Sequence, residues 1–453
     1  MIVHKFGGAS VKDAESIRRV PSLLKSIDDE RVFIVISAMG KTTNKLEIIT
    51  NRAFEREDFI DLFEELKNEH LALIYDLLPE DKDSYKLLFE LFVECLNVIV
   101  TTSKDYYSFF YDQVVSFGER FSSFILESYL KHCGFDVKLL DAEKLFTSDD
   151  NWRAGNVDTV LSKRSIEDAI SLNNNKFLIT QGFIAGAYSG ESVTLGREGS
   201  DYSAGLIAAY SNASEIIFWK DVDGIYSADP KMQLYATTRG NGEKVIMSNF
   251  SSELEKSEAV IQNLKPIFGP AVKINKMSYS EMIELSFFGA KVLHEKTLFA
   301  LQDKNIKMQV RSFINVDRQG TYLFNTSEEK YPPIKILSEN QILYTCEPRS
   351  RALINSNHIK LIYDCADDCN VNIGLIQMSA LKISFCAAYD EFACSKMYSR
   401  LKDNFKVKYN SNVLLVTLRH YSDENLAEFA DAENVLLSQI SRVTAQFVLK
   451  SYR

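Results

Sequence analysis

The sequence predicts an α/β fold in which a mostly parallel central sheet is flanked by helices and followed by small ferredoxin-like domains. Over the first 300 residues, short apolar strands alternate with amphipathic helical runs, which is typical of a parallel sheet. After about residue 300 the order becomes strand, helix, strand, strand, helix, strand, as in a ferredoxin-like sandwich. We therefore expect a first domain at 1–300, a connecting hairpin and linker at 301–334, and tandem small domains at 335–453.

Five strands are expected in the first domain, and most of them run into Gly, Ser or Asp. They are "MIVHKFGG", "RVFIVIS", "DVKLL", "KFLITQGFIAG" and "EIIFWKDVDG". The helices expected between them lie at 12–27, 58–78, 85–102, 119–132 and 201–210. Because ligands of such sheets bind at the carboxyl ends of the strands, the small and charged residues there form the candidate site.

The rest of the chain is expected to be richer in strands. "NIKMQVRSF" and "GTYLFN" form a strand pair, and the charged, proline-containing "SEEKYPP" at 327–333 is a linker. The ferredoxin-like order is built from "QILYTCEP", a helix at 357–370, "VNIGLIQMS", "LKISFCAAYD", a helix at 391–404 and "FKVKYNSNVLLVTLRH". Two more strands are expected in "ENVLLSQISRVTAQFVLK".

The composition is that of a soluble globular protein, with 46% apolar and 25% charged residues. A net charge of −10 argues against a nucleic-acid partner, and no stretch is apolar enough to span a membrane. The N-terminus lacks the basic start and apolar core of a signal peptide, so we expect a cytoplasmic location and seven free thiols. The cysteine pair in "CADDC" has no histidine pair nearby, so no metal-ligating residue is assigned.

The stretch that most resembles a P-loop does not match the P-loop pattern, so a nucleotide site of that type is excluded. "SAMGKTTN" at 37–44 contains Gly-Lys-Thr, but the position of the first P-loop glycine is Val35, inside a buried strand. Other stretches carry better signals. In "KFGGAS", Lys5 at a strand end supplies positive charge, and Gly7 and Gly8 let backbone amides approach an anion. Taken alone, this Gly-Gly is more often just a tight turn.

Three further stretches place charge at strand ends or helix starts. In "TLGREGSDYSAGLIAAY", Asp201 begins a helix whose N-terminus attracts phosphate, and Arg197 suits a carboxylate, although a capped helix with a solvated arginine is the alternative. "WKDVDGIYSADPK" offers Asp221 and Tyr226 to a nucleotide, although its Asp-Gly and Asp-Pro pairs are also plain turn signals. In "SFGER", Glu119 near a helix start suits a substrate ammonium.

Taken in order, these motifs resemble the aspartokinases of the amino-acid kinase superfamily over essentially the whole chain. The resemblance rests on K-F-G-G, S-A-M-G-K-T-T, G-E-R, G-F-I-A-G, T-L-G-R-x-G-S-D-Y-S-A, D-V-D-G-I-Y-x-A-D-P and "FFGAKVLH", and the C-terminal part resembles paired ACT domains. It implies an enzyme that transfers the γ-phosphate of ATP, with Mg²⁺, to the β-carboxylate of L-aspartate. The product, 4-phospho-L-aspartate, begins lysine, threonine and methionine biosynthesis.

The resemblance also implies roles for individual residues. Lys5 and Asp201 are the catalytic pair, and Thr43, Glu119 and Arg197 bind aspartate. The nucleotide-binding residues are Lys5, Gly7, Gly8, Ser37, Lys220, Asp221, Tyr226 and Lys231. No general base is needed, because a carboxylate nucleophile is already ionised at neutral pH.

The chain departs from the family pattern at several positions. Ala9, Glu198, Lys220 and Glu295 stand where threonine, glycine, threonine and proline are usual. His358 and Lys360 lie where the first ACT helix usually opens with small residues, so the effector, lysine or threonine in relatives, stays open.

The expected assembly is a homodimer or larger, because ACT-type sheets usually pair in this family. The alternatives are another amino-acid kinase, such as a glutamate 5-kinase, and a non-catalytic amino-acid sensor. At 453 residues we expect no fused homoserine dehydrogenase.

Overall fold

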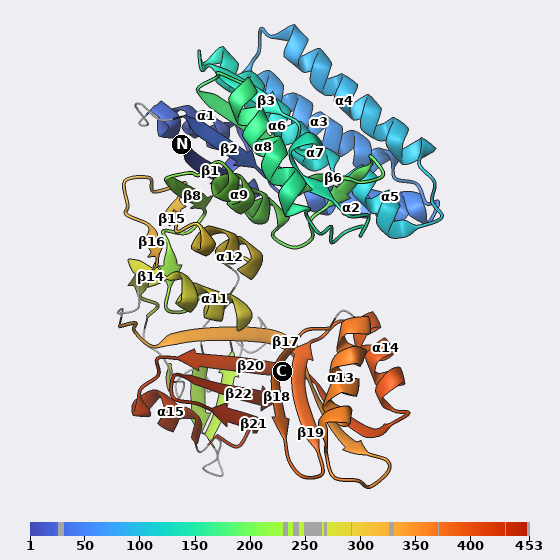
Figure 1. Ribbon diagram of the computed structural model, residues 1–453, viewed down its shortest axis with the longest axis vertical. Coiled ribbons are helices and arrows are strands. Elements are labelled where there is room, and N and C mark those ends of the chain that lie inside the picture. The colour runs from blue at the N-terminus through green and yellow to red at the C-terminus, as the bar shows by residue number, and fades with distance from the viewer. Residues whose placement is uncertain are drawn as a thin grey trace. The chain divides into compact units, whose positions relative to one another are not determined.

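The computed structural model describes residues 1–25, 31–229, 234–238, 244–248, 265–266, 270–290, 292–325, 330–369, 371–430 and 432–450. They form two compact units that interleave along the chain (Figure 1). The first unit is Met1–Ile225, Asn275–Ile283 and Val292–Glu329, and the second is Tyr226–Ile274, Glu284–Lys291 and Lys330–Arg453. The domain limits at 300 and 334 stay predictions. No helix in the described ranges is long and apolar enough to cross a membrane.

The first unit is built on an eight-stranded sheet with the order β14-β16-β15-β8-β1-β2-β5-β3. Its strands are β1 (Ile2–Phe6), β2 (Val32–Ile36), β3 (Val137–Leu140), β5 (Phe177–Gln181), β8 (Glu215–Lys220), β14 (Lys276–Ser278), β15 (Lys307–Ser312) and β16 (Thr321–Phe324). β1 pairs in parallel with β2 and β8, whereas β15 and β16 pair antiparallel. The prediction of a mostly parallel sheet is confirmed, and the central strands are apolar because both their faces are buried.

Helices cover this sheet. They are η1 (Gly8–Val11), α1 (Ala14–Lys25), α2 (Thr42–Phe54), α3 (Ile60–Leu77), α4 (Lys82–Thr101), α5 (Tyr107–Val115), α6 (Phe117–His132), α7 (Ala142–Leu145), α8 (Thr159–Leu172), α9 (Gly199–Tyr210), α11 (Tyr279–Phe287, shared between the units) and α12 (Glu295–Asp303). The five predicted helices are confirmed with ends shifted by a few residues. Helices α2, α5, α7, α8, α11 and α12 were not among those predicted.

One predicted strand is wrong. "KFLITQGFIAG" breaks after β5, and β6 (Ile184–Ala187) joins β4 (Thr147–Ser148) and β7 (Ser192–Thr194) in a separate three-stranded sheet. The break has a steric cause. Phe183 has a φ of 70°, and a Cβ on Gly182 would lie 2.7 Å from the Cβ of Ser200. The chain therefore leaves the central sheet where α9 packs against it.

The second unit contains a six-stranded antiparallel sheet with the order β18-β19-β17-β20-β22-β21. Its strands are β17 (Ile334–Pro348), β18 (Ile373–Met378), β19 (Ile383–Ala388), β20 (Phe405–Arg419), β21 (Val435–Ile440) and β22 (Thr444–Lys450), and its helices are α13 (Ser356–Asp368), α14 (Glu391–Leu401) and α15 (Asp423–Ala430). The predicted strand and helix order is confirmed, although β17 begins earlier than expected and α15 was not predicted. Shorter strands are β9 (Ile225–Tyr226), β10 (Leu234–Thr238), β11 (Lys244–Ser248), β12 (Lys265–Pro266) and β13 (Lys273–Ile274).

His358 has a structural role at the start of α13. The Asn355 side chain accepts from the backbone N–H of His358, and His358 Nδ1 accepts from the backbone N–H of Asn355, so the two form a capping box. Lys360 on the same helix is exposed. All seven cysteines are free thiols, as predicted.

Helix α6 carries Glu119 and is held from outside by aromatic packing. Phe92 of α4 stacks on Phe121 of α6, with ring centroids 3.8 Å apart and planes 15° apart, and both rings are fully buried. His70 of α3 packs edge-on against both rings. α3 and α4 are therefore attached to α6 mainly by apolar burial.

We predict that Phe92→Ala destabilises the first unit by about 3–5 kcal/mol, because it leaves a cavity beneath α4. Phe89→Ala on the same helix is the matched control, since Phe89 is 41% exposed and should cost about 1 kcal/mol or less. Both tryptophans, Trp152 and Trp219, belong to the first unit, so tryptophan fluorescence during urea unfolding reports on that unit. An equal loss of unfolding free energy in the two variants would contradict the conclusion that apolar burial of Phe92 attaches α4 to α6.

Candidate active site

A cavity of about 600 Å³ opens in the first unit at the carboxyl ends of β1, β2 and β8, beside the N-terminus of α9. Its lining includes ten residues predicted from the sequence: Lys5, Gly7, Gly8, Ser37, Thr43, Glu119, Arg197, Asp201, Lys220 and Asp221. Tyr226 belongs to the second unit, and Lys231 lies outside the described residues. The sequence motifs therefore converge on one place, as expected for a parallel sheet.

The centre of the cavity is a buried cluster of three charges. Lys5 Nζ lies 2.5 Å from one carboxylate oxygen of Asp201, and Lys220 Nζ lies 2.8 Å from the other. The Asp201 side chain is 3% exposed, so water screens these charges little. Asp201 thus holds the two lysine amines side by side at the N-terminus of α9.

The pKa values follow from this arrangement. Burial alone would raise the pKa of Asp201, but the charges of Lys220 and Lys5 outweigh it and lower that pKa to about 2. Burial lowers the pKa of Lys5, and Asp201 offsets part of that effect. Burial also opposes the charge of Lys220, yet Asp201 raises the Lys220 pKa above its ordinary value. Asp201 and Lys220 are therefore charged at neutral pH.

Main-chain atoms line the cavity next to Lys5. A Cβ on Gly8 would lie 2.6 Å from the carbonyl oxygen of Ala38, so no side chain fits there. The N–H of Gly40 donates to the Gly8 carbonyl at 2.9 Å, and Gly40 has a φ of 55°. The loops after β1 and β2 therefore lie directly against each other, and "SAMGKTTN" forms part of the cavity wall before α2 rather than a P-loop.

The carboxyl group of Glu119 is part of the cavity lining. Its Oε1 accepts from the backbone N–H of Ala38 at 3.1 Å, and its buried Oε2 has no hydrogen-bond partner among the described residues. Burial raises the pKa of Glu119 to about 8, although the Ala38 hydrogen bond opposes this shift. A buried carboxyl with one free oxygen is suited to receive a cation from a ligand.

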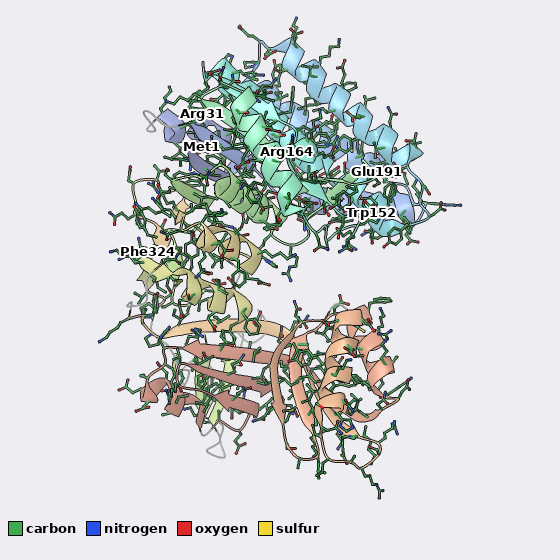
Figure 2. The ribbon with its side chains drawn as sticks, in the orientation of Figure 1. Met1, Arg31, Trp152, Arg164, Glu191 and Phe324 are labelled. Carbon is green, nitrogen blue, oxygen red and sulfur yellow. The ribbon has the colours of Figure 1, made fainter. Side chains whose placement is uncertain are left out.

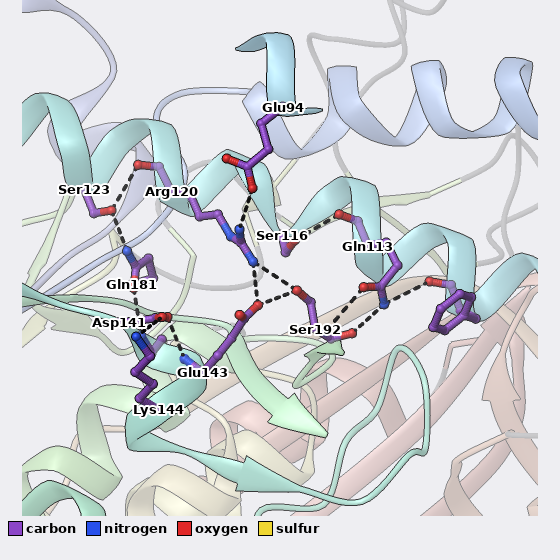
Figure 3. Close-up of polar contacts among 12 residues, drawn as sticks. Glu94, Gln113, Ser116, Arg120, Ser123, Asp141, Glu143, Lys144, Gln181 and Ser192 are labelled. Carbon is purple, nitrogen blue, oxygen red and sulfur yellow. Dashed lines mark hydrogen bonds and ion pairs between the residues drawn. The ribbon is translucent and has the colours of Figure 1, made fainter. Parts of the chain in front are cut away.

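A polar network links helices α5, α6 and α7 to strand β7 (Figure 3). Arg120 donates to Glu143 at 2.6 Å and to Ser192 Oγ at 3.1 Å, and Ser192 Oγ also donates to Glu143. Gln113 of α5 binds the backbone of Ser192 through both ends of its amide, at 2.8 and 3.3 Å. Helices α5 and α6 are thereby fastened to β7, which leads into the Arg197 loop.

The loop before α9 carries two charged residues on the cavity wall. Arg197 is exposed, and its side chain forms no ion pair among the described residues. Glu198 has a φ of 54°, a left-handed conformation in which glycine is favoured. Burial and the neighbouring Asp201 raise the pKa of Glu198. The carboxylate that replaces the usual glycine therefore lies close to the charge cluster.

Several lining residues were missed by sequence reasoning, namely Glu47, Tyr111, Arg153, Phe183 and Thr194. Beneath them lies Asp112, which is fully buried and accepts from Thr194 Oγ1 at 2.6 Å. Phe183 and Thr194 stand in the quoted motifs G-F-I-A-G and T-L-G-R-x-G-S-D-Y-S-A, where no role was assigned to them. Glu47, Tyr111 and Arg153 stand in no motif. For these three, the one usable signal was the run of aromatic residues around Tyr111, which indicates a packed helix as readily as a site.

No metal centre is formed by the protein alone in the described part of the chain, where no group of three or more His, Cys, Asp or Glu is arranged around one point. Both oxygens of Asp201 are already bound by ammonium groups. The arrangement suits a polyanion whose negative charge meets Lys5, Lys220 and backbone amides, beside a second ligand that brings a cation to Glu119.

Comparisons with known proteins identify the family of the chain. The sequence model described as the amino acid kinase family matches residues 1–239. A bifunctional aspartokinase/homoserine dehydrogenase 2 of Arabidopsis thaliana is 28% identical over 417 residues, which are 89% of this chain and 42% of that protein. An aspartokinase of Chlamydia pneumoniae is 28% identical over 349 residues, covering 76% of this chain and 68% of the relative. The chain thus spans about two fifths of the plant relative.

Solved structures show the same fold. Aspartokinase III of E. coli, in complex with aspartate and ADP, superposes with a TM-score of 0.79 at 22% identity, covering 99% of this chain and 96% of that one. An aspartate kinase of Clostridium acetobutylicum gives a TM-score of 0.69 at 20% identity, with 99% and 96% coverage. The family match covers more than half of the sequence, and this chain belongs to the amino acid kinase family.

Proposed function

We propose that the protein is an aspartate kinase, which transfers the γ-phosphate of ATP to the β-carboxylate of L-aspartate and forms 4-phospho-L-aspartate. The observation that carries the proposal is the Lys5–Asp201–Lys220 cluster, which shares one cavity with the free carboxyl oxygen of Glu119 and with Arg197. Similarity to aspartokinases from a plant and a bacterium supports it. A glutamate 5-kinase and a non-catalytic sensor are outcomes that the assays below distinguish.

The reaction needs positioning and charge compensation rather than a base. A β-carboxylate oxygen of aspartate attacks the γ-phosphorus, the bond from that phosphorus to the β–γ bridging oxygen breaks, and ADP leaves with the bond's electrons. No proton moves, because the carboxylate is already ionised at neutral pH. Negative charge on the transferring group is met by Lys5 and Lys220, and Asp201 fixes the orientation of both.

The remaining residues are assigned to the two substrates. Gly7, Gly8 and Ser37 lie along the phosphates, and Asp221, Tyr226 and Lys231 serve the rest of the nucleotide. Thr43 and Glu119 hold aspartate, with Glu119 at its ammonium, and Arg197 binds its α-carboxylate. A bound Mg²⁺ would supply further charge neutralisation on the phosphates, and it would arrive with the nucleotide because Asp201 is occupied by lysines.

Regulation and assembly are part of the same proposal. Aspartokinase III of E. coli has been solved in complex with lysine and aspartate, at a TM-score of 0.70 to this chain. The second unit, with its ferredoxin-like sheet, is where we place an amino-acid effector, lysine or threonine. We also propose a homodimer or larger assembly, a cytoplasmic location, and a place at the start of lysine, threonine and methionine biosynthesis.

We predict that the protein forms aspartyl hydroxamate from ATP, aspartate and hydroxylamine, which traps the acyl phosphate, and that glutamate gives far less. Lys5→Ala should lower kcat by about 10²–10³-fold or more, because it removes a charge that acts in the transition state. Lys163→Ala, an exposed lysine on α8, is the control and should keep full activity. Preferred turnover of glutamate would overturn the choice of substrate. Binding without any turnover would favour a sensor.

We predict that aspartate binding at pH 7 releases about one proton. Glu119, with its pKa raised to about 8, is protonated in the free protein and must ionise to receive an ammonium. Affinity for aspartate should therefore rise up to about tenfold per pH unit as the pH increases towards 8. Calorimetry in two buffers with different ionisation enthalpies measures the proton count. Glu119→Gln should bind more weakly and release none; unchanged release in that variant would disprove the assignment.

We predict that lysine or threonine inhibits turnover, because each would stabilise one arrangement of the second unit over another. Initial rates with lysine, threonine and methionine, added singly, identify the effector. Lys360→Ala serves as a probe, since removing an exposed positive charge should strengthen inhibition by lysine but not by threonine. A flat response to all three amino acids would refute feedback control of this kind.

A further inference from the structure

An arginine outside all of the motifs, Arg153, faces the cavity, and the role inferred for it rests on the proposed function. Arg153 lies in the loop between β4 and α8 and lines the cavity. Its guanidinium lies 4.4 Å from the ring centroid of Tyr111 and 5.6 Å from that of Tyr107. Among the described residues, the Arg153 side chain forms no ion pair or hydrogen bond with an acid, and neither does Arg197. Two guanidinium groups therefore face one cavity with their donors available.

The backbone of Arg153 is held in a conformation that arginine does not favour. Its φ is 69°, which costs roughly 1 kcal/mol or more for a residue other than glycine. Asparagine or glycine would relieve this strain, so the arginine is best explained by its side chain. Two other non-glycine residues with positive φ, Phe183 and Glu198, line the same cavity.

Contacts on both sides fix the loop. The N–H of Arg153 donates to Asp112 Oδ2 at 2.8 Å, and the ring of Trp152 packs edge-on against Phe109 of α5 at 4.9 Å (Trp152 is labelled in Figure 2). The N–H of Asn156 donates to Asp149 at 2.8 Å, which closes the loop on itself. The side chain therefore projects from a rigid support, as a binding residue requires.

Asp112 links this loop to the strand that leads to Arg197. Besides Arg153, its carboxylate accepts from Thr194 Oγ1 at 2.6 Å and from Thr194 N–H at 3.1 Å. A Cβ on Gly196 would lie 3.2 Å from the carbonyl oxygen of Arg153, so the two loops touch through their main chains. The backbones that carry Arg153 and Arg197 are thus held next to each other by one buried carboxylate.

The surroundings of Arg153 place it in the acceptor half of the cavity. Tyr111, whose ring supports the guanidinium, donates its hydroxyl to Glu47 Oε1 at 2.6 Å. Glu47 lies one helical turn after Thr43 on α2, so both face the same side. The charge cluster for phosphate lies instead at β1, β8 and α9. A guanidinium lying over an aromatic face keeps its N–H edge free for a carboxylate.

We propose that Arg153 is a second acceptor-binding arginine, which together with Arg197 binds the acceptor carboxylate that is not phosphorylated. The site would then select acceptors that carry two carboxylates, one for the two arginines and one for phosphoryl transfer. Asp112 is a positioning residue, which acts through the Arg153 backbone.

The test compares Arg153→Ala and Arg153→Lys with the control Arg164→Ala, which changes an arginine on the exposed surface of α8 (Figure 2). Arg153→Ala should raise the KM and the calorimetric Kd for L-aspartate about 10–100-fold, with kcat and the KM for ATP changed much less. Arg153→Lys should recover only part of the loss, because an ammonium cannot form the paired hydrogen bonds.

Acceptor analogues separate binding from a structural role. Succinate keeps both carboxylates, so its Kd should weaken with Arg153→Ala as that of aspartate does. β-Alanine lacks the α-carboxylate, so its weaker Kd should not change. Equal losses for aspartate and β-alanine, or an unchanged Kd for aspartate, would overturn the proposal.

The outcomes for the inference and for the proposed function are distinguishable. If the wild-type protein binds aspartate and succinate through Arg153 but forms no acyl phosphate, the kinase proposal fails and the second arginine stands. If aspartate is phosphorylated normally by Arg153→Ala, the inference alone fails. If no dicarboxylate binds the wild-type protein, both fail.

Discussion

The contact on which the site depends is the bridge from Lys5 through Asp201 to Lys220, since it joins β1, α9 and β8 at one point. Charges this deep are stable only when paired, because leaving water costs several kcal/mol per ion. Asp201 lies between two ammonium groups, so removing it would leave both buried without a counter-charge. A protein stabilised by apolar packing alone would not need this cluster, and its position at the strand ends is the basis for the anion-binding role proposed above.

Much of the fold could be predicted because its signals are local. The run of buried residues in β2 and the glycine after β1 identify a parallel sheet and its ligand-binding edge. Lys5, Glu119 and Asp201 could be identified because they stand in motifs whose order resembles a known family. The break in the strand at Phe183 could not be predicted, because its cause is the approach of Ser200 from α9.

Arg153 could not be identified from the sequence, because the contacts that hold it also join residues far apart in the chain. Asp112, which holds its backbone, is 41 residues away, and the Thr194 that completes the contact is 82 residues from Asp112. No local pattern encodes such pairings. Lys220 is the intermediate case, since the sequence showed it as a departure from the usual threonine, and its contact with Asp201 explains how a partly buried lysine is accommodated there.

Main-chain atoms line the cavity beside Lys5, and this limits which substitutions the sequence can accept there. At Gly8 the neighbouring carbonyl of Ala38 leaves no room for even a methyl group. Under the proposed function, substitutions can reshape the acceptor wall one side chain at a time, whereas position 8 on the phosphate side has room for glycine alone. If the chain is the kinase proposed above, new specificities in this scaffold should arise by changing what receives the phosphoryl group and not what donates it.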